Sequence, residues 1–242
     1  MSQIPEENNV ITLSGTVVTE PELDHVLYGE EFYSFSISIP RLSGAADCVP
    51  LTVSDRLMTG RMPKVGDHIT MRGQLRSYNK QIDGVSRLII TAFAKMFKYE
   101  DVEYDREFIN DICLTGFICK PVIYRTTPFM REIADILIAV NRQYGKSDYL
   151  PCIAWGRNAR FAGNMPVGEQ IKLEGRIQSR KYQKSIGADE VVERVAYEIS
   201  CSLIELASKR DAVSDEHEHE REHVAGTEQQ SGDYMEEPVN MR

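Results

Sequence analysis

Apolar and polar residues alternate along several stretches of this chain, most clearly between residues 169 and 182. Ile171, Leu173 and Ile177 fall on one face of an extended backbone. The other face carries basic and polar side chains and ends in an aromatic ring: Lys172, Arg176, Gln178, Arg180 and Tyr182. A period of two residues predicts an antiparallel strand with one buried and one exposed face.

The same pattern predicts five strands in the second half of the chain, at 110–119, 133–141, 149–155, 169–182 and 191–206. Between the third and fourth strands, the segment GRNARFAGNMPVG is long enough for one short helix. Five strands with a helix between strands three and four form the plan of an OB fold, a small Greek-key barrel that binds oligonucleotides on strands two and three. Gly175, in the middle of the fourth strand, would allow the sharp bend that closes such a barrel.

The first half of the chain resembles the second. ITLSGTVVTEPEL from Ile11 matches ICLTGFICKPVIY from Ile112, and VGDHITMRGQLRS from Val65 matches VGEQIKLEGRIQS from Val167. The offset of 101 to 102 residues predicts two homologous domains, because each unit is large enough to bury its own core. We therefore predict an all-β protein with two tandem OB-fold five-stranded barrels, each with a short helix, and a disordered acidic C-terminal tail. The predicted boundaries are 1–100 for the first domain, 101–109 for a linker, 110–208 for the second domain and 209–242 for the tail.

Charged residues are unevenly distributed along the chain. Residues 1–110 carry 11 Lys and Arg against 16 Asp and Glu, whereas residues 111–210 carry 15 against 11. Residues 211–242 carry 2 against 10. The net charge of −9 for the whole chain argues against a polyanionic partner, but residues 111–210 form a segment with a net positive charge. We therefore expect a phosphate backbone to bind to the second domain.

Cysteine spacing and hydropathy exclude several other classes of protein. The five cysteines form no C-x-x-C pair, which indicates small buried thiols rather than a disulfide framework or a zinc site. The chain has no run of about 18 apolar residues and no apolar leader, so we expect a soluble, cytoplasmic protein.

One stretch of the predicted tail matches a motif that occurs in a class of enzymes. HEREH, from His219 to His223, fits the H-E-x-x-H pattern of zinc metalloproteases. A metalloprotease helix needs an apolar face and a third ligand, but residues 211–234 are charged and nearly free of large apolar side chains. We expect a solvated acidic linker, with adventitious metal binding by His217, His219 and His223 as the alternative. The sequence thus predicts no catalytic site, no metal site and no cofactor.

Several short motifs in the second predicted domain occur together in one known family. They are Leu114-Thr115-Gly116, the Pro-x-x-x-Arg step from Pro121, Ala-Val-Asn-Arg at 139–142, Trp155-Gly156 and the ribbon EGRIQSR at 174–180. With these motifs the domain resembles the bacterial single-stranded DNA-binding proteins. The resemblance implies sequence-independent binding of single-stranded DNA during replication, recombination and repair, in the cytoplasm at the nucleoid. The alternative is an OB-fold scaffold or RNA-binding adaptor that binds protein partners rather than single-stranded DNA.

The resemblance also implies which side chains contact DNA. Family members stack bases on aromatic rings near the hairpin of strands two and three, at both ends of strand three and at the end of strand four. Here those positions hold Tyr144, Tyr149, Trp155 and Tyr182. Independently of the family, a protein that holds any single strand needs π-faces for the bases and cations for the phosphates. The candidate cations are Arg142, Lys146, Arg157, Arg176, Arg180 and Lys181.

The residues alone leave other roles open for these side chains. Tyr and Trp also occur as core residues whose polar ends reach the surface. The arginines and lysines are equally compatible with a solvated surface.

The first predicted domain lacks most of these rings. The positions aligned with Tyr144, Tyr149 and Trp155 hold Ser43, Cys48 and Ser54. Only Tyr78 is available to replace the aromatic of the fourth strand. We expect this domain to bind DNA weakly or not at all and to serve assembly. Because family members commonly gather four OB units, the resemblance implies a homodimer of this chain.

The end of the chain departs from the family. Family members end in an acidic stretch closed by an Asp-Ile-Pro-Phe-like peptide, whose phenylalanine docks in partner enzymes. Here the last residues read YMEEPVNMR, so the hydrophobic anchor is missing. Replication and repair proteins remain possible partners, without the usual anchor.

Overall fold

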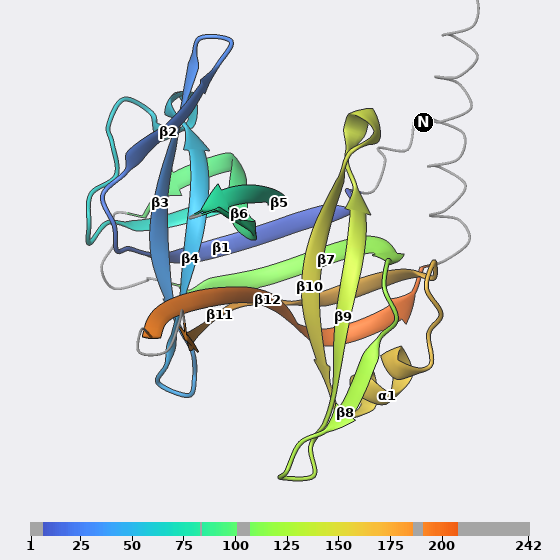
Figure 1. Ribbon diagram of the computed structural model, residues 1–242. Helices are drawn as coiled ribbons and strands as arrows, with labels where there is room; N and C mark the ends of the chain where they lie inside the picture. The colour runs from blue at the N-terminus through green and yellow to red at the C-terminus, as the bar shows by residue number, and fades with distance from the viewer. Residues whose placement is uncertain (1–6, 83, 101–106, 186–190, 208–242) are drawn as a thin grey trace, which may run out of the picture. The chain divides into compact units, whose positions relative to one another are not determined.

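The structure, a computed structural model, describes residues 7–82, 84–100, 107–185 and 191–207. The predicted tail, its HEREH motif and most of the predicted linker lie outside these residues. The described chain is built mainly from strands, as the alternation of apolar and polar residues predicts (Figure 1). None of its described helices has the length and apolar character needed to cross a membrane.

The two halves contain corresponding strands in the same order. Strands of the first half are β1 (Asn9–Val17), β2 (Glu22–Leu27), β3 (Glu30–Pro40), β4 (Ala46–Ser54), β5 (His68–Ile82) and β6 (Val85–Tyr99). Strands of the second half are β7 (Ile109–Ile118), β8 (Ile123–Thr126), β9 (Glu132–Asn141), β10 (Ser147–Trp155), β11 (Gln170–Ser185) and β12 (Val191–Leu206). The short helices are η1 (Asp55–Met58) after β4, η3 (Gln143–Gly145) before β10 and α1 (Arg157–Gly163) after β10.

Each half closes into a five-stranded barrel of the OB type. In the second half, β7 pairs with β9 and β11, β11 pairs with β12, and β9 pairs with β10. A parallel pairing of β10 with β12 at Cys152 and Ile199 completes the ring. In the first half the parallel pair is β4 with β6, at Leu51 and Ala92. The tandem OB architecture predicted from the sequence is confirmed, although the short helix of the first half is a 3₁₀ turn rather than an α-helix.

The sequence pattern misses two strands, β2 and β8. Each pairs with the next strand in the chain to form a hairpin. All residues of both strands are exposed. A strand without a buried face has no alternation of apolar and polar residues, so nothing in the hydropathy marks it.

The fourth barrel strand of the second half, β11, shows the predicted burial. Ile171, Leu173 and Ile177 are buried in the barrel. The pairing with β12 shifts register between Glu174 and Gly175, which forms a bulge at the predicted bend. A Cβ atom on Gly175 would overlap the carbonyl oxygen of Ser200, so only glycine allows this approach of the two strands.

The first strands of the two halves, β1 and β7, pair with each other. The pairing is antiparallel and is centred on Ile11 and Ile112. On either side, Asn9 lies opposite Leu114 and Leu13 lies opposite Asn110, so the pairing is symmetric about its centre. Residues 7–206 form one compact unit. The domain boundaries given above therefore stay a prediction.

Candidate nucleic-acid interface

The outer face of β10 carries two aromatic rings. Tyr149 is 49% exposed and Trp155 is 41% exposed, whereas Leu150, Cys152 and Ala154 point into the barrel and are buried. Ile153 shares the outer face but is only 7% exposed. Tyr149 and Trp155 therefore lie on one face of a strand, and neither is a core residue.

The other two predicted rings lie outside β10. Tyr182 is exposed on the arm of β11, and the Arg180 guanidinium carbon is 5.9 Å from the centre of its ring. Tyr144 lies in η3, close to the start of β10, and its side chain lies outside the described part of the structure. The structure thus places three described rings on β10 and β11.

Three of the predicted cations have no acidic partner among the described residues. Lys146, Arg157 and Arg180 are exposed and make no ion pair there. Lys181 contacts Glu193 at 2.9 Å, and this hydrogen bond raises the pKa of the lysine. Because both groups are exposed, the pair is weak and leaves Lys181 accessible to phosphate.

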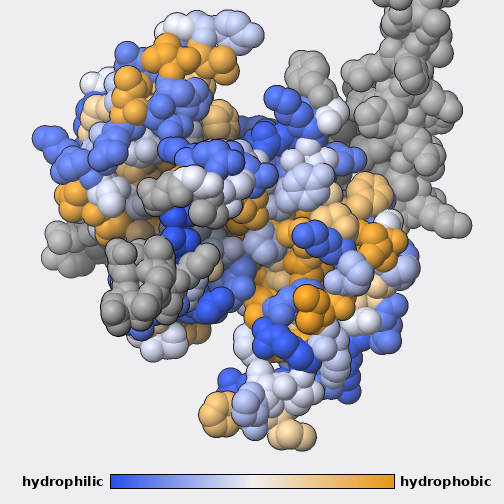
Figure 2. Space-filling model, in the orientation of Figure 1, coloured by the Kyte–Doolittle hydropathy of each residue, from blue (hydrophilic) through white to orange (hydrophobic). Residues whose placement is uncertain are grey.

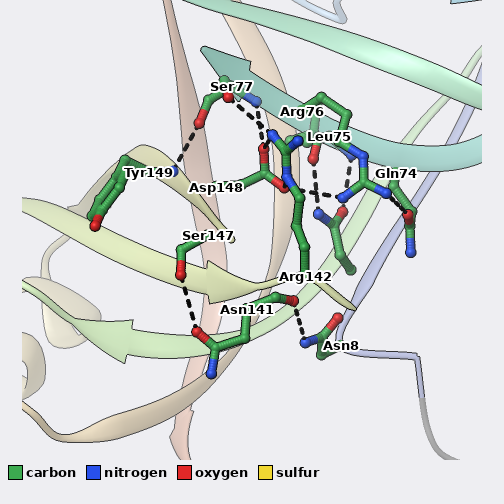
Figure 3. Close-up of polar contacts among 11 residues, drawn as sticks. Asn8, Gln74, Leu75, Arg76, Ser77, Asn141, Arg142, Ser147, Asp148 and Tyr149 are labelled. Atoms are coloured by element: carbon green, nitrogen blue, oxygen red, sulfur yellow. Dashed lines mark hydrogen bonds and ion pairs between the residues drawn. The ribbon is translucent and has the colours of Figure 1, made fainter. Parts of the chain in front are cut away.

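Arg142 differs from these cations, because it is already bound within the protein (Figure 3). Its Nε donates to Asp148 Oδ2 at 2.6 Å, and its Nη2 donates to Asp148 Oδ1 and, at 2.9 Å, to the carbonyl of Ser77 in the first half. Arg76 donates to the same carboxylate at 3.1 Å. Arg142 is therefore one of the residues that join the two halves, and its contact with DNA stays a prediction.

The equivalent contact also occurs with the roles of the two halves exchanged. Arg41 donates to Asp47, whose Oδ1 accepts from the backbone N–H of Ser179 at 2.8 Å. Arg176 lies 3.7 Å from this carboxylate, so it too is partly engaged. We call the two sets, Arg41–Asp47–Ser179 and Arg142–Asp148–Ser77, the reciprocal clamps.

The internal repeat of the sequence contains a signal for these clamps, separate from the alternation of apolar and polar residues that predicts the strands. Arg41 and Asp47 recur as Arg142 and Asp148 at the repeat distance, while the stacking rings do not recur. A symmetric contact between the two copies requires the same residues in both, and this pair of residues meets that requirement.

The first half has no comparable set of rings. Ser54 takes the place of Trp155, and its buried hydroxyl donates to Glu30 and accepts from the backbone N–H of Arg56. Tyr78 is exposed on β5, but it lies five residues after the bulge glycine Gly73, as Arg180 does after Gly175. Tyr78 therefore corresponds to Arg180 rather than to Tyr182.

The described residues offer no evident metal site. No group of three or more His, Cys, Asp or Glu side chains among them is placed to hold a metal ion. What the described surface does offer is exposed aromatic rings and exposed cations.

Comparison with known proteins relates this chain to a family. Residues 109–206 match the Single-strand binding protein family. Single-stranded DNA-binding protein 1 of Streptococcus pyogenes is 31% identical over 110 residues, which are 43% of this chain and 82% of that protein. The single-stranded DNA-binding protein of Clostridium tetani is 30% identical over 114 residues, 44% of this chain and 77% of that protein.

A solved structure extends the likeness to both halves. The wild-type single-stranded DNA binding protein from Thermus aquaticus superposes with a TM-score of 0.66, covering 83% of this chain and 93% of that one. Its sequence identity to this chain is 18%, so this likeness concerns the fold.

Proposed function

We propose that this chain, which belongs to the single-strand binding protein family, binds single-stranded DNA without reading its sequence. The observation that carries the proposal is the outer face of β10, where Tyr149 and Trp155 are both about half exposed. Cations without acidic partners lie at both ends of that strand, Lys146 before it and Arg157 after it.

This arrangement supports sequence-tolerant binding. Six residues of strand separate Tyr149 from Trp155, a distance of about 20 Å along the backbone. Each ring offers a face on which any base stacks, and a stack contributes about 1 to 3 kcal/mol. Lys146, Arg157 and Arg180 supply charge for the phosphates between stacked bases. Lys181 contributes from the arm of β11.

The two halves then have different roles. The second half holds the DNA, and the first half, which lacks the rings, serves assembly. We propose that two chains associate to supply four OB units, and a sedimentation mass of a single chain would contradict this. The protein acts by binding and not by catalysis, in the cytoplasm, on DNA exposed by replication, recombination and repair.

The emission of Trp155, the only tryptophan of the chain, tests the proposal directly. Titration with oligo(dT) is expected to quench this emission, because a stacked base lies against the indole. Absence of binding in both fluorescence and gel-shift assays would refute the function. Binding without any change of emission would remove Trp155 from the site.

Two substitutions separate the stacking and charge contributions. Trp155→Ala is expected to weaken binding by about 1 to 3 kcal/mol at any salt concentration. Arg180→Ala should instead lower the slope of log affinity against log salt by about 0.7, the value for one phosphate contact on a single strand. Tyr78→Ala, which removes an exposed ring from the first half, is the control and should leave both quantities unchanged.

A further inference from the structure

The turn of the β8–β9 hairpin has an unusual residue at its tightest point. Thr127, Pro128, Phe129 and Met130 form a turn in which the Met130 N–H donates to the Thr127 carbonyl at 2.9 Å. The Thr127 N–H in turn donates to the Arg131 carbonyl at 2.8 Å, which closes a three-residue loop. Met130 has φ +58°, the left-handed conformation that such loops usually give to glycine. Methionine at this position strains the backbone.

Packing of the turn side chains does not offset this strain. Phe129 is 86% exposed and Met130 is 81% exposed. Figure 2 shows hydrophobic residues at the tip of this hairpin, at the lower end of the view. A strained backbone that carries exposed apolar side chains is evidence for a role other than stability.

The base of the same hairpin lies beside Trp155. The Gly156 N–H donates to the Glu132 carbonyl at 3.0 Å, which ties the end of β10 to the start of β9. Met130, Arg131, Glu132, Trp155 and Gly156 line an open hollow of about 440 Å³. The hollow therefore has an indole on one element and a methionine side chain on another.

The charges around the hollow favour an anionic ligand with an apolar part. The charge of Glu132 is balanced by Arg160 at 3.0 Å, and the same carboxylate accepts a hydrogen bond from the Tyr124 hydroxyl at 2.6 Å. Arg131 is exposed, and among the described residues its guanidinium has no hydrogen bond or ion pair. One cation is thus free beside an apolar hollow.

We propose that this hollow holds the nucleotide that stacks on Trp155, with Met130 as the second wall for its base and Arg131 as the contact for its flanking phosphate. The thioether of methionine packs well against an aromatic face, so it serves as the second wall. The inference rests on the proposed function and extends the stacking site of Trp155 by two residues, Met130 and Arg131, that are not among the predicted site residues. At the related position of the first half, Ser54 replaces Trp155, so that position has no ring on which a base could stack.

Substitution of Met130 by glycine in the full chain separates strain from binding. Met130→Gly relieves the left-handed backbone, so the melting temperature should stay the same or rise. Affinity for oligo(dT) should fall about 5- to 10-fold, the lower part of the range for one base stack. Quenching of Trp155 at saturating DNA should also decrease.

The chain provides a matched control in its first half. Tyr28 is 98% exposed at the tip of the β2–β3 hairpin and also has a left-handed backbone, with φ +50°. Tyr28→Gly therefore makes the same change of backbone and also removes an exposed side chain, but it should leave DNA affinity unchanged.

Arg131 is tested in the same way. Arg131→Gln should lower the salt slope of binding, whereas Arg125→Gln, on the same hairpin, should lower it less because Arg125 already binds Asp135 at 3.0 Å. The subsite is refuted if Met130→Gly and Arg131→Gln bind oligo(dT) as well as the parent protein. The proposed function still stands in that case, provided that the unaltered protein binds oligo(dT) and that Trp155→Ala weakens this binding. If the unaltered protein does not bind, the proposed function itself fails.

Discussion

The reciprocal clamps lead to a prediction about the stability of the whole chain. The Asp148 side chain is 0% exposed, and its carboxylate accepts hydrogen bonds from Arg142, Arg76 and the backbone N–H of Ser77. Asp148→Ala removes every one of these acceptors at once. It also leaves two arginines, each only about a quarter exposed, without their carboxylate.

The size of the effect follows from this burial. Removing one partner of a buried ion pair costs about 3 to 5 kcal/mol, because the other charge stays desolvated and unpaired. A typical domain has a free energy of unfolding of about 5 to 15 kcal/mol, so the variant should lose a large share of its stability. Asp47→Ala, at the related position, should cost somewhat less, since Arg176 is 3.7 Å from Asp47 whereas Arg76 is 3.1 Å from Asp148.

Equilibrium unfolding in urea, followed by circular dichroism, measures this cost. The control is Glu193→Ala, which breaks the exposed pair with Lys181 and should cost less than about 1 kcal/mol. A double-mutant cycle with Arg142→Ala should show a coupling energy well above that of the exposed pair. If Asp148→Ala destabilises the chain no more than Glu193→Ala does, the clamp does not hold the halves together.

Two further predictions follow from buried groups. Gly175→Ala should lower the free energy of unfolding by about 1 to 3 kcal/mol, because the added methyl overlaps the Ser200 carbonyl; an unchanged urea midpoint would show that the bulge relaxes freely. Burial raises the pKa of the Cys152 thiol well above its usual value, so at pH 8 this residue forms less thiolate than a free cysteine. We therefore expect Cys152 to react with a disulfide reagent only after the protein unfolds. The exposed Cys48 should react in the folded protein, and Cys48→Ser should remove that fast phase; fast reaction of Cys152 in the folded chain would contradict its burial.

The sequence predicts those strands that have one buried face. In β11 the apolar residues Ile171, Leu173 and Ile177 lie on one face and are buried, so the period of two residues is visible in the sequence. In β8 all residues are exposed, and the strand exists because its backbone pairs with β9. Such a strand depends on a partner strand and on the turn that joins the two, and neither can be predicted from the hydropathy of its own residues.

Assigning single charges is harder than assigning strands. Arg142 is the last residue of the Ala-Val-Asn-Arg motif shared with a DNA-binding family, and nothing in its neighbours along the chain marks it as a partner of Ser77, 65 residues away. Lys146, four residues later, is a free exposed cation. The difference between the two residues depends on which barrel lies opposite, and only the fold provides that information.

The repeat itself can separate these roles. A contact between two copies of one unit needs the same residues in both copies, and the clamps show this in Arg41 and Arg142 and in Asp47 and Asp148. A surface that only one copy uses is free to differ in the other, and Tyr149 and Trp155 are replaced by Cys48 and Ser54.

The candidate cations can also be sorted by whether they occur in both copies or in the second copy alone. Lys146 aligns with Ala45 and Arg180 with Tyr78, so these two charges belong to the second half alone. Arg157 is the exception, because Arg56 occupies the related position and lies 3.4 Å from Glu30, a pairing that Arg157 lacks among the described residues. The first copy thus binds this charge internally, while the second copy presents it beside Trp155. The two barrels share one architecture and differ in which charges and rings are left available to a ligand.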